Sequence, residues 1–185
     1  MPKMVILDIE TTGLDPIKNS MIELGAVITD ENLTSITDMV TYVKLRENTV
    51  INKSAMEVNQ INLNSQAYGL FAIDPRIAVF GFNSWVLSNC EGGKPFVAGW
   101  NPSFDVSFMR SYYKEYGLEW PFHYRMLDVQ SINAFVDNFN FTSLKSVRAA
   151  QKHRALDDAF DVLSRLKELR SMISNKYPNK GDCLG

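Results

Sequence analysis

The sequence predicts an α/β fold in which a mixed five-stranded sheet carries helices on both faces. Residues 4–9 form an apolar run that ends in carboxylates, as in a central strand that is buried on both faces. Residues 21–29 and 36–45 indicate two further strands, and the short polar links between these runs favour an antiparallel meander. Helical patterns then alternate with short apolar runs, and this order of elements is typical of a mixed sheet covered by helices.

The remaining elements follow in order along the chain. Ser54, with Glu57 three residues later, is the predicted N-cap of a short helix. Asp74 and Pro75 are predicted to open a longer helix, because proline fits the first helical turn. The predicted elements after the meander are helices at 54–61 and 74–88, a strand at 96–100, a helix at 103–116, an edge strand or loop at 122–129, helices at 129–135 and 142–150, and a final helix from 153 or 154 to about 173.

One domain is expected to account for the whole chain. Its 185 residues suffice for a single hydrophobic core, so we expect a domain over residues 1–177 and a flexible tail over 178–185. No apolar run approaches the roughly 20 residues that span a bilayer, and the first residues lack the pattern of a signal peptide. The two cysteines lie far apart without metal-ligand spacing. We therefore expect a cytoplasmic protein with no membrane partner.

Charge is distributed unevenly along the sequence. The formal net charge is −2, so the chain lacks the overall basic charge of many nucleic-acid-binding proteins. Seven acidic residues and one lysine lie within residues 8–38, whereas residues 141–154 contain four basic residues and no acid. An acidic centre beside a basic segment suits metal ions and a phosphate chain, although a solvated loop and helix face would show the same pattern.

The first candidate site lies at the end of the first strand, in the sequence D-I-E-T-T-G. Because side chains alternate along a strand, Asp8 and Glu10 project from the same face, with Cα atoms roughly 7 Å apart. Carboxylates at the end of an apolar strand are costly unless paired or metal-bound, and hard oxygen ligands favour Mg²⁺ or Mn²⁺ over Zn²⁺. A strand end that emerges into solvent explains the two acids equally well. Thr11, Thr12 and Gly13 favour the site, because a tight turn with hydroxyl groups beside carboxylates suits a nucleotide.

Two further motifs supply the other candidates. Asp105, in N-P-S-F-D, follows a strand and opens a helix, so it is either a third site carboxylate or an acid that complements the helix dipole. His153, in H-R-A-L-D-D, lies near the start of the last helix, a position that also suits a histidine without function. Asp158 is preferred over Asp157 as a ligand, because its helical stripe is apolar whereas that of Asp157 is polar.

These candidates form a complete set for metal-dependent phosphodiester hydrolysis. Four carboxylates can hold two divalent ions roughly 3.5–4 Å apart, which activate a water and stabilise the leaving oxygen. A histidine can take the proton of that water. The sequence shows no phosphate-binding P-loop, zinc-ligand spacing, nucleophile elbow or dinucleotide fingerprint that would favour another chemistry.

The three motifs resemble those of the DEDDh exonucleases, the superfamily of proofreading exonucleases, RNase T and oligoribonuclease, from residue 4 to about residue 173. The resemblance implies an RNase H-like fold and stepwise 3′→5′ release of nucleoside 5′-monophosphates from a single-stranded 3′ end. It implies that two Mg²⁺ or Mn²⁺ ions are held by the four acids and that His153 is the general base. The matching positions further imply substrate contacts by Thr11, Thr12, Gly13 and Leu14, and a supporting role beside the substrate for Asn101.

Signals for the substrate disagree within the family. The segments F-H-Y-R-M-L-D-V at 122–129 and H-R-A-L-D-D resemble oligoribonucleases, whereas D-I-E-T-T-G and N-P-S-F-D resemble proofreading and RNase T-type enzymes. Asn59 stands where a histidine is common in those enzymes, and His123 is interpreted as structural. We expect single-stranded DNA as the favoured substrate, with RNA also cleaved. An oligoribonuclease is the main alternative, a catalytically inactive binding module is another, and a homodimer is compatible with the family.

Overall fold

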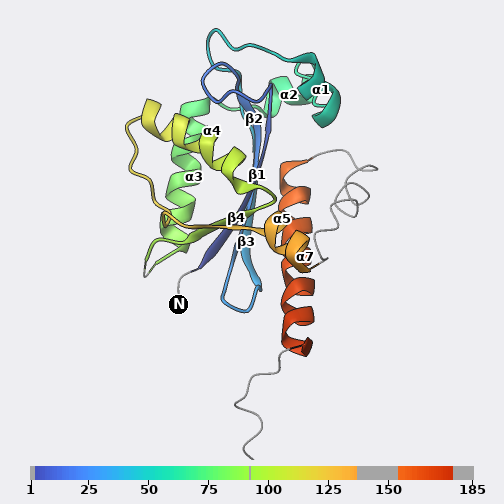
Figure 1. The fold of residues 1–185 in the computed structure, drawn as a ribbon. Coiled ribbons are helices and arrows are strands. Elements are labelled where there is room, and N and C mark those ends of the chain that lie inside the picture. The colour runs from blue at the N-terminus through green and yellow to red at the C-terminus, as the bar shows by residue number, and fades with distance from the viewer. Residues whose placement is uncertain (1–2, 92, 137–153, 177–185) are drawn as a thin grey trace, which may run out of the picture.

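The computed structural model describes residues 3–91, 93–136 and 154–176, which form a five-stranded sheet with helices on both faces (Figure 1). The strand order is β3-β2-β1-β4-β5. The first three strands form an antiparallel meander, and β4 and β5 run parallel to β1, which confirms the predicted mixed sheet. The strands are β1 (Met4–Thr11), β2 (Met21–Thr29), β3 (Ser35–Tyr42), β4 (Phe96–Gly99) and β5 (Met126–Asp128).

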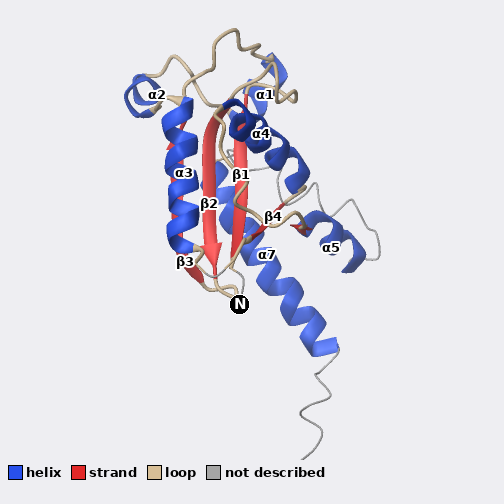
Figure 2. Ribbon diagram, turned by 90° about the vertical axis from the view of Figure 1, so that its left-hand side faces the viewer, coloured by secondary structure: helices blue, strands red, loops and turns tan. Residues whose placement is uncertain are grey.

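Alternation along the central strand sends its side chains into two separate cores. Val5, Leu7 and Ile9 pack with residues of α3 and α4 on one face. Ile6 packs with α5 and α7 on the other, so Asp8 and Glu10 project from the α7 face. Figure 2 looks onto the α3 and α4 face, with α7 behind the sheet. The helices are α1 (Lys53–Asn59), α2 (Gln66–Phe71), α3 (Pro75–Asn89), α4 (Pro102–Glu115), α5 (Val129–Val136) and α7 (Ala155–Lys176).

Local details differ from the sequence prediction at α1 and α2. Ser54 is not the N-cap of α1, because the helix begins at Lys53, and Asn52 precedes it without a side-chain capping bond. Helix α2 was not predicted from the sequence; its six residues start after Ser65, whose hydroxyl accepts the Tyr68 N–H at 3.1 Å. The predicted helix at 142–150 and tail at 178–185 lie outside the described residues. Within the described ranges no helix combines the length and hydrophobicity needed to cross a membrane.

Candidate metal centre

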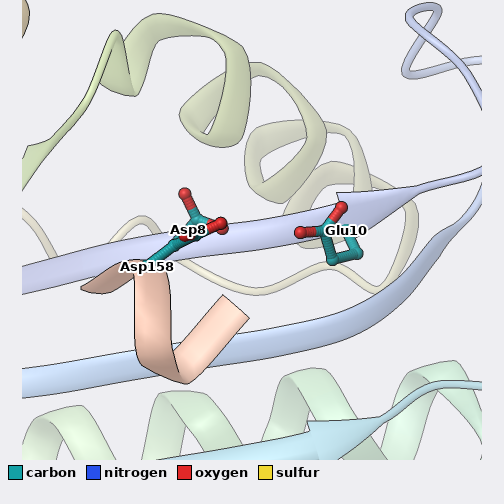
Figure 3. A group of neighbouring side chains, drawn as sticks. All are labelled: Asp8, Glu10 and Asp158. Carbon is teal, nitrogen blue, oxygen red and sulfur yellow. The ribbon is translucent and has the colours of Figure 1, made fainter. Parts of the chain in front are cut away.

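Three carboxylates from β1 and α7 meet on one face of the sheet. Asp8, Glu10 and Asp158 each offer an oxygen, and these oxygens all lie within 4.8 Å of one another (Figure 3). Asp8 and Asp158 are half-buried and Glu10 is buried. A set made only of carboxylate oxygens suits a hard divalent cation such as Mg²⁺ or Mn²⁺. The structure therefore brings together three of the five residues that the sequence motifs single out.

Asp105 lies beside this group on the open side of β1. Strand β1 pairs with β4 only from Met4 to Ile6, so its next residues lack a parallel neighbour. The Asp105 carboxylate, from the first turn of α4, accepts the backbone N–H of Ile9 at 3.0 Å and is 4% exposed. Asp105 is outside the three-carboxylate group but close enough to Glu10 to raise the pKa of that side chain.

The helical-face argument for Asp158 agrees with the burial along α7. Asp157 is exposed, and so is Asp161 one turn later. Asp158 is half-buried and lies on the same side of α7 as Val162 and Leu166, both of which are buried. Asp158 alone of the two neighbouring acids belongs to the carboxylate group, so Asp157 serves as its matched exposed control.

The first turn of α7 lies directly against strand β2. Gly25 pairs with Asp8 across the sheet, and a Cβ atom added to Gly25 would lie 2.3 Å from the Ala155 carbonyl carbon and from the Leu156 nitrogen. Only glycine permits such a close approach of the helix backbone. Glu23, two residues earlier on the same face, accepts the Ala155 N–H through Oε2 at 3.2 Å. Strand β2 is therefore in direct contact with the turn of α7 that leads to Asp158.

Burial and like charge dominate the electrostatics of the site. Burial, together with the charges of Asp158, Glu23 and Asp105, raises the pKa of Glu10 from 4.5 to about 8, against the opposing charge of Arg154. Burial also raises the pKa of Glu23, although its hydrogen bond from Ala155 opposes the shift. Positive charge from a bound cation would relieve this repulsion, which is the fit expected between these residues and a divalent metal.

The raised pKa of Glu10 makes the metal-free protein sensitive to pH. Folded Glu10 keeps its proton up to about pH 8, whereas its ordinary value is 4.5, so the folded state binds more protons between these values. The free energy of unfolding should therefore fall as pH rises through that window. Urea denaturation in EDTA across the window measures the slope, and Glu10→Gln should flatten it. An equal slope in wild type and variant would contradict the assignment.

The loop after β1 is a closely packed turn. The Thr11 hydroxyl donates to the Gly13 carbonyl at 2.7 Å, and the Thr12 hydroxyl donates to the Val50 carbonyl at 2.9 Å. A Cβ atom on Gly13 would lie 2.4 Å from Asn52 Nδ2 and 2.5 Å from Asn19 Cγ, so a larger residue here would displace these side chains. Thr12 has no exposed surface, and its hydroxyl is bonded within the loop. The predicted contact between its hydroxyl and a nucleotide stays a prediction.

Leu14 projects from the tip of that loop into solvent. Its side chain is 80% exposed, and Ile17 nearby in sequence is 76% exposed. An exposed apolar side chain that follows the strand with two of the three carboxylates provides a surface against which a nucleobase can pack. The predicted contact between Leu14 and a base thus has the required exposure, and it stays a prediction.

Arg46 anchors the same loop to helix α4. Its guanidinium lies 3.1 Å from a Glu115 carboxylate oxygen, donates to the Pro16 carbonyl at 2.8 Å and to the Asn19 carbonyl, and covers the Tyr112 ring at 4.3 Å. The Arg46 side chain is only 12% exposed. The planar guanidinium makes all these contacts at once, which a lysine ammonium does not reproduce.

Replacing Arg46 should loosen the loop that carries Leu14. We expect Arg46→Ala to lower the free energy of unfolding by about 2 kcal/mol, since it removes charged hydrogen bonds from a nearly buried position. Arg46→Lys should recover little of this loss. Urea denaturation measures the effect. The exposed pair of Lys18 and Asp15 offers the control, because Lys18→Ala should cost below about 1 kcal/mol. Equal losses in the Arg46 and Lys18 variants would refute the anchoring role.

The other residues that the sequence motifs single out differ in their exposure and in their contacts. Asn101 has a left-handed backbone with φ of 61° before α4, is exposed, and accepts the Ser103 hydroxyl at 2.7 Å. Asn59 is 1% exposed and donates to the Thr11 carbonyl at 3.0 Å, so it holds α1 against β1 and offers no surface to a base. His123 stacks on Tyr124, in agreement with its structural interpretation. His153 lies outside the described residues, so its predicted role as general base stays a prediction.

Glu23 is the site residue that the sequence motifs did not reveal. It is 2% exposed and pairs with Glu10 across β1 and β2. The signal was present, because Glu23 is the sole charged residue of the apolar strand M-I-E-L-G-A-V-I-T. A charge in a fully buried strand requires a partner, and that partner, Ala155, lies 132 residues away in the sequence.

Sequence comparisons connect the chain with nucleases along nearly its full length. The family model described as Exonuclease, of the RNase T type, matches residues 5–164. An oligoribonuclease of Actinobacillus pleuropneumoniae is 26% identical over 185 residues, and one of Pseudoalteromonas translucida is 29% identical over 184 residues. Each alignment covers 93% of this chain, and they cover 94% and 96% of the two relatives. The chain thus corresponds to these relatives almost from end to end.

Solved structures of E. coli exonuclease I share the fold. The zinc-bound complex with single-stranded DNA superposes with a TM-score of 0.75 at 16% identity, covering 98% of this chain and 42% of that one. A further structure of exonuclease I gives a TM-score of 0.74 at 15% identity, covering 92% of this chain and 41% of the other. The chain spans about two fifths of exonuclease I. This likeness confirms the predicted RNase H-like α/β fold.

Proposed function

The chain belongs to the exonuclease family, within the DEDDh 3′→5′ exonucleases, and from that premise we propose that it hydrolyses single-stranded nucleic acid from the 3′ end with two divalent metal ions. Its enzyme class, an exonuclease that hydrolyses phosphodiester bonds, follows from this membership. The observation that carries the proposal is the meeting of Asp8, Glu10 and Asp158 within 4.8 Å. A binding module without catalysis would not need to keep these three buried or half-buried acids together.

The roles of the side chains follow from their positions. Asp8 and Glu10, fixed on the central strand, and Asp158, fixed on α7, would hold the metal, with Asp105 as the fourth acid. When bound, two ions supply an activated water and stabilise the leaving oxygen of the phosphodiester. His153 is proposed to take the proton of the attacking water. Leu14 and the tight turn at Gly13 are proposed to hold the terminal nucleotide beside these groups.

Magnesium or manganese is the proposed metal. The described ligands are all carboxylates, which suit these hard cations better than zinc, although the similar exonuclease I structure was described in a zinc-bound form. Isothermal titration of the nuclease with Mn²⁺ in the presence of a nucleoside monophosphate should give two ions per chain. A stoichiometry of one would remove the two-metal part of the proposal while leaving metal dependence intact.

Two substrate classes remain in competition. The motifs D-I-E-T-T-G and N-P-S-F-D favour single-stranded DNA, with RNA as a further substrate. The end-to-end match with two oligoribonucleases favours very short RNAs instead. Competition between a labelled RNA dinucleotide and long single strands of DNA and RNA separates the classes. Marked preference for the dinucleotide would reject the DNA proposal, and preference for the long DNA strand would reject the oligoribonuclease alternative.

A further inference from the structure

Glu23 is a buried carboxylate beside the metal centre whose described hydrogen bond is to a helix rather than to a member of the carboxylate group. It is 2% exposed, and its Oε2 accepts the N–H of Ala155, the first residue of α7, at 3.2 Å. We propose that Glu23 is a positioning residue that holds the first turn of α7 and thereby places Asp158 against Asp8 and Glu10. The inference rests on the proposed function for its consequence in catalysis, but the positioning itself does not depend on it.

The N–H that Glu23 accepts needs an external partner. The first N–H groups of an α-helix have no partner within the helix, and Ala155 has no exposed surface through which water could supply one. A carboxylate is also favoured at this end of a helix, where the dipole is positive. Glu23 supplies the acceptor from a neighbouring strand, whereas a capping side chain usually comes from the residue just before the helix.

Ala155 and Asp158 lie within one turn of α7, so a hydrogen bond that fixes Ala155 also restricts the position of Asp158. Asp158 donates its own N–H to the Arg154 carbonyl at 2.9 Å, so the turn between Ala155 and Asp158 is regular helix. Gly25 sets the height of the same turn above the sheet, and Glu23 sets its position along β2. Metal ligands must keep their distances within about 0.2 Å, so a small slide of this turn would spoil the site.

The geometry disfavours a role for Glu23 as a further metal ligand. Glu23 is absent from the group of carboxylates whose oxygens lie within 4.8 Å of one another. Its charged neighbours are Arg154, Asp157 and Asp158, and its partner Glu10 lies across the strand pair. A carboxylate ligand supplies negative charge to the metal, whereas a positioning residue needs only an oxygen that accepts the Ala155 N–H. Glutamine supplies that oxygen without the charge.

The test compares Glu23→Gln with Glu23→Met, which keeps the volume of the side chain and removes the acceptor. We expect Glu23→Met to lower kcat and Mn²⁺ affinity by about 10- to 100-fold with KM changed less than about threefold, as for residues that orient metal ligands. Glu23→Gln should stay within about threefold of wild type in each quantity. Mn²⁺ affinity is measured by electron paramagnetic resonance with the metal alone, and hydrogen exchange reports the first turn of α7.

Val27→Ala is the matched control for lost stability. Val27 lies on the same face of β2, two residues after Gly25, and its apolar side chain packs in the α7 core without a group that could accept the Ala155 N–H. The control should be destabilised yet bind Mn²⁺ as wild type does. Equal losses in Glu23→Gln and Glu23→Met, or wild-type Mn²⁺ affinity and kcat in Glu23→Met, would overturn the proposal. If the wild-type protein showed no metal-dependent cleavage but Glu23→Met still weakened Mn²⁺ binding, the proposed function would be refuted and the positioning role of Glu23 would stand.

Discussion

Asp158→Asn is expected to reduce metal-dependent cleavage about a thousandfold, because the loss of one metal ligand removes several kcal/mol of transition-state stabilisation. The fold should survive the change. Asp158 is the charge that contributes most to the raised pKa of Glu10, so its neutralisation relieves repulsion between the two side chains. Steady-state cleavage of a labelled single strand with Mn²⁺ measures the loss, and urea denaturation without metal measures the stability.

Asp157→Asn is the matched control for Asp158→Asn. It makes the same chemical change at the adjacent position of α7, where the side chain is exposed. We expect activity within about threefold of wild type, since an exposed charge outside the ligand group contributes little. If Asp157→Asn were the more damaging variant, the assignment of the helical faces would be wrong, and with it the choice of metal ligand.

Gly25→Ala should have the second largest effect, on stability and activity together. The new Cβ atom would lie 2.3 Å from two backbone atoms of α7 and 2.7 Å from the Ala155 oxygen. Backbone atoms cannot turn aside as a flexible side chain does, so the helix must lift away from the sheet. We expect the free energy of unfolding to fall by about 3 kcal/mol, as in strongly overpacked cores, and Mn²⁺ affinity to fall as Asp158 moves.

Gly81→Ala is the control for Gly25→Ala: it makes the same substitution at a position where we expect stability to rise. Gly81 lies in the exposed part of α3, and a Cβ atom there meets nothing within 4 Å. Alanine is favoured over glycine inside a helix, so this variant should gain about 0.5–1 kcal/mol. Thermal or urea denaturation of both variants tests the pair. A Gly25→Ala protein as stable as wild type would show that α7 does not lie against β2 as described.

The sequence predicted the elements whose patterns are long and regular. The apolar run of β1, the meander and the proline-initiated helix α3 were all foreseen, because burial and local chemistry agree there. Helix α2 was missed because its six residues bury only Tyr68, which gives no periodic signal. The predicted cap at Ser54 failed because the chain enters α1 two residues earlier, at Asn52.

Site residues were predictable where each residue could be judged from its own element. Strand alternation placed Asp8 and Glu10 on one face, and helical spacing distinguished Asp158 from Asp157. Contacts between distant segments were not predictable in the same way. Nothing local indicates that Glu23 accepts an N–H from α7, or that the Thr12 hydroxyl is taken by the Val50 carbonyl. Those partners depend on how the sheet and its loops pack together.

The central claim is that the acids on β1 and α7 direct metal-dependent removal of nucleotides from a 3′ end. The direct measurement follows a 5′-end-labelled single strand during incubation with Mn²⁺, with wild type and Asp8→Ala in parallel. We predict a ladder that shortens one nucleotide at a time, release of 5′-monophosphates, and arrest in EDTA and in Asp8→Ala. Metal-independent shortening, internal cleavage, or an Asp8→Ala ladder equal to that of wild type would contradict the claim.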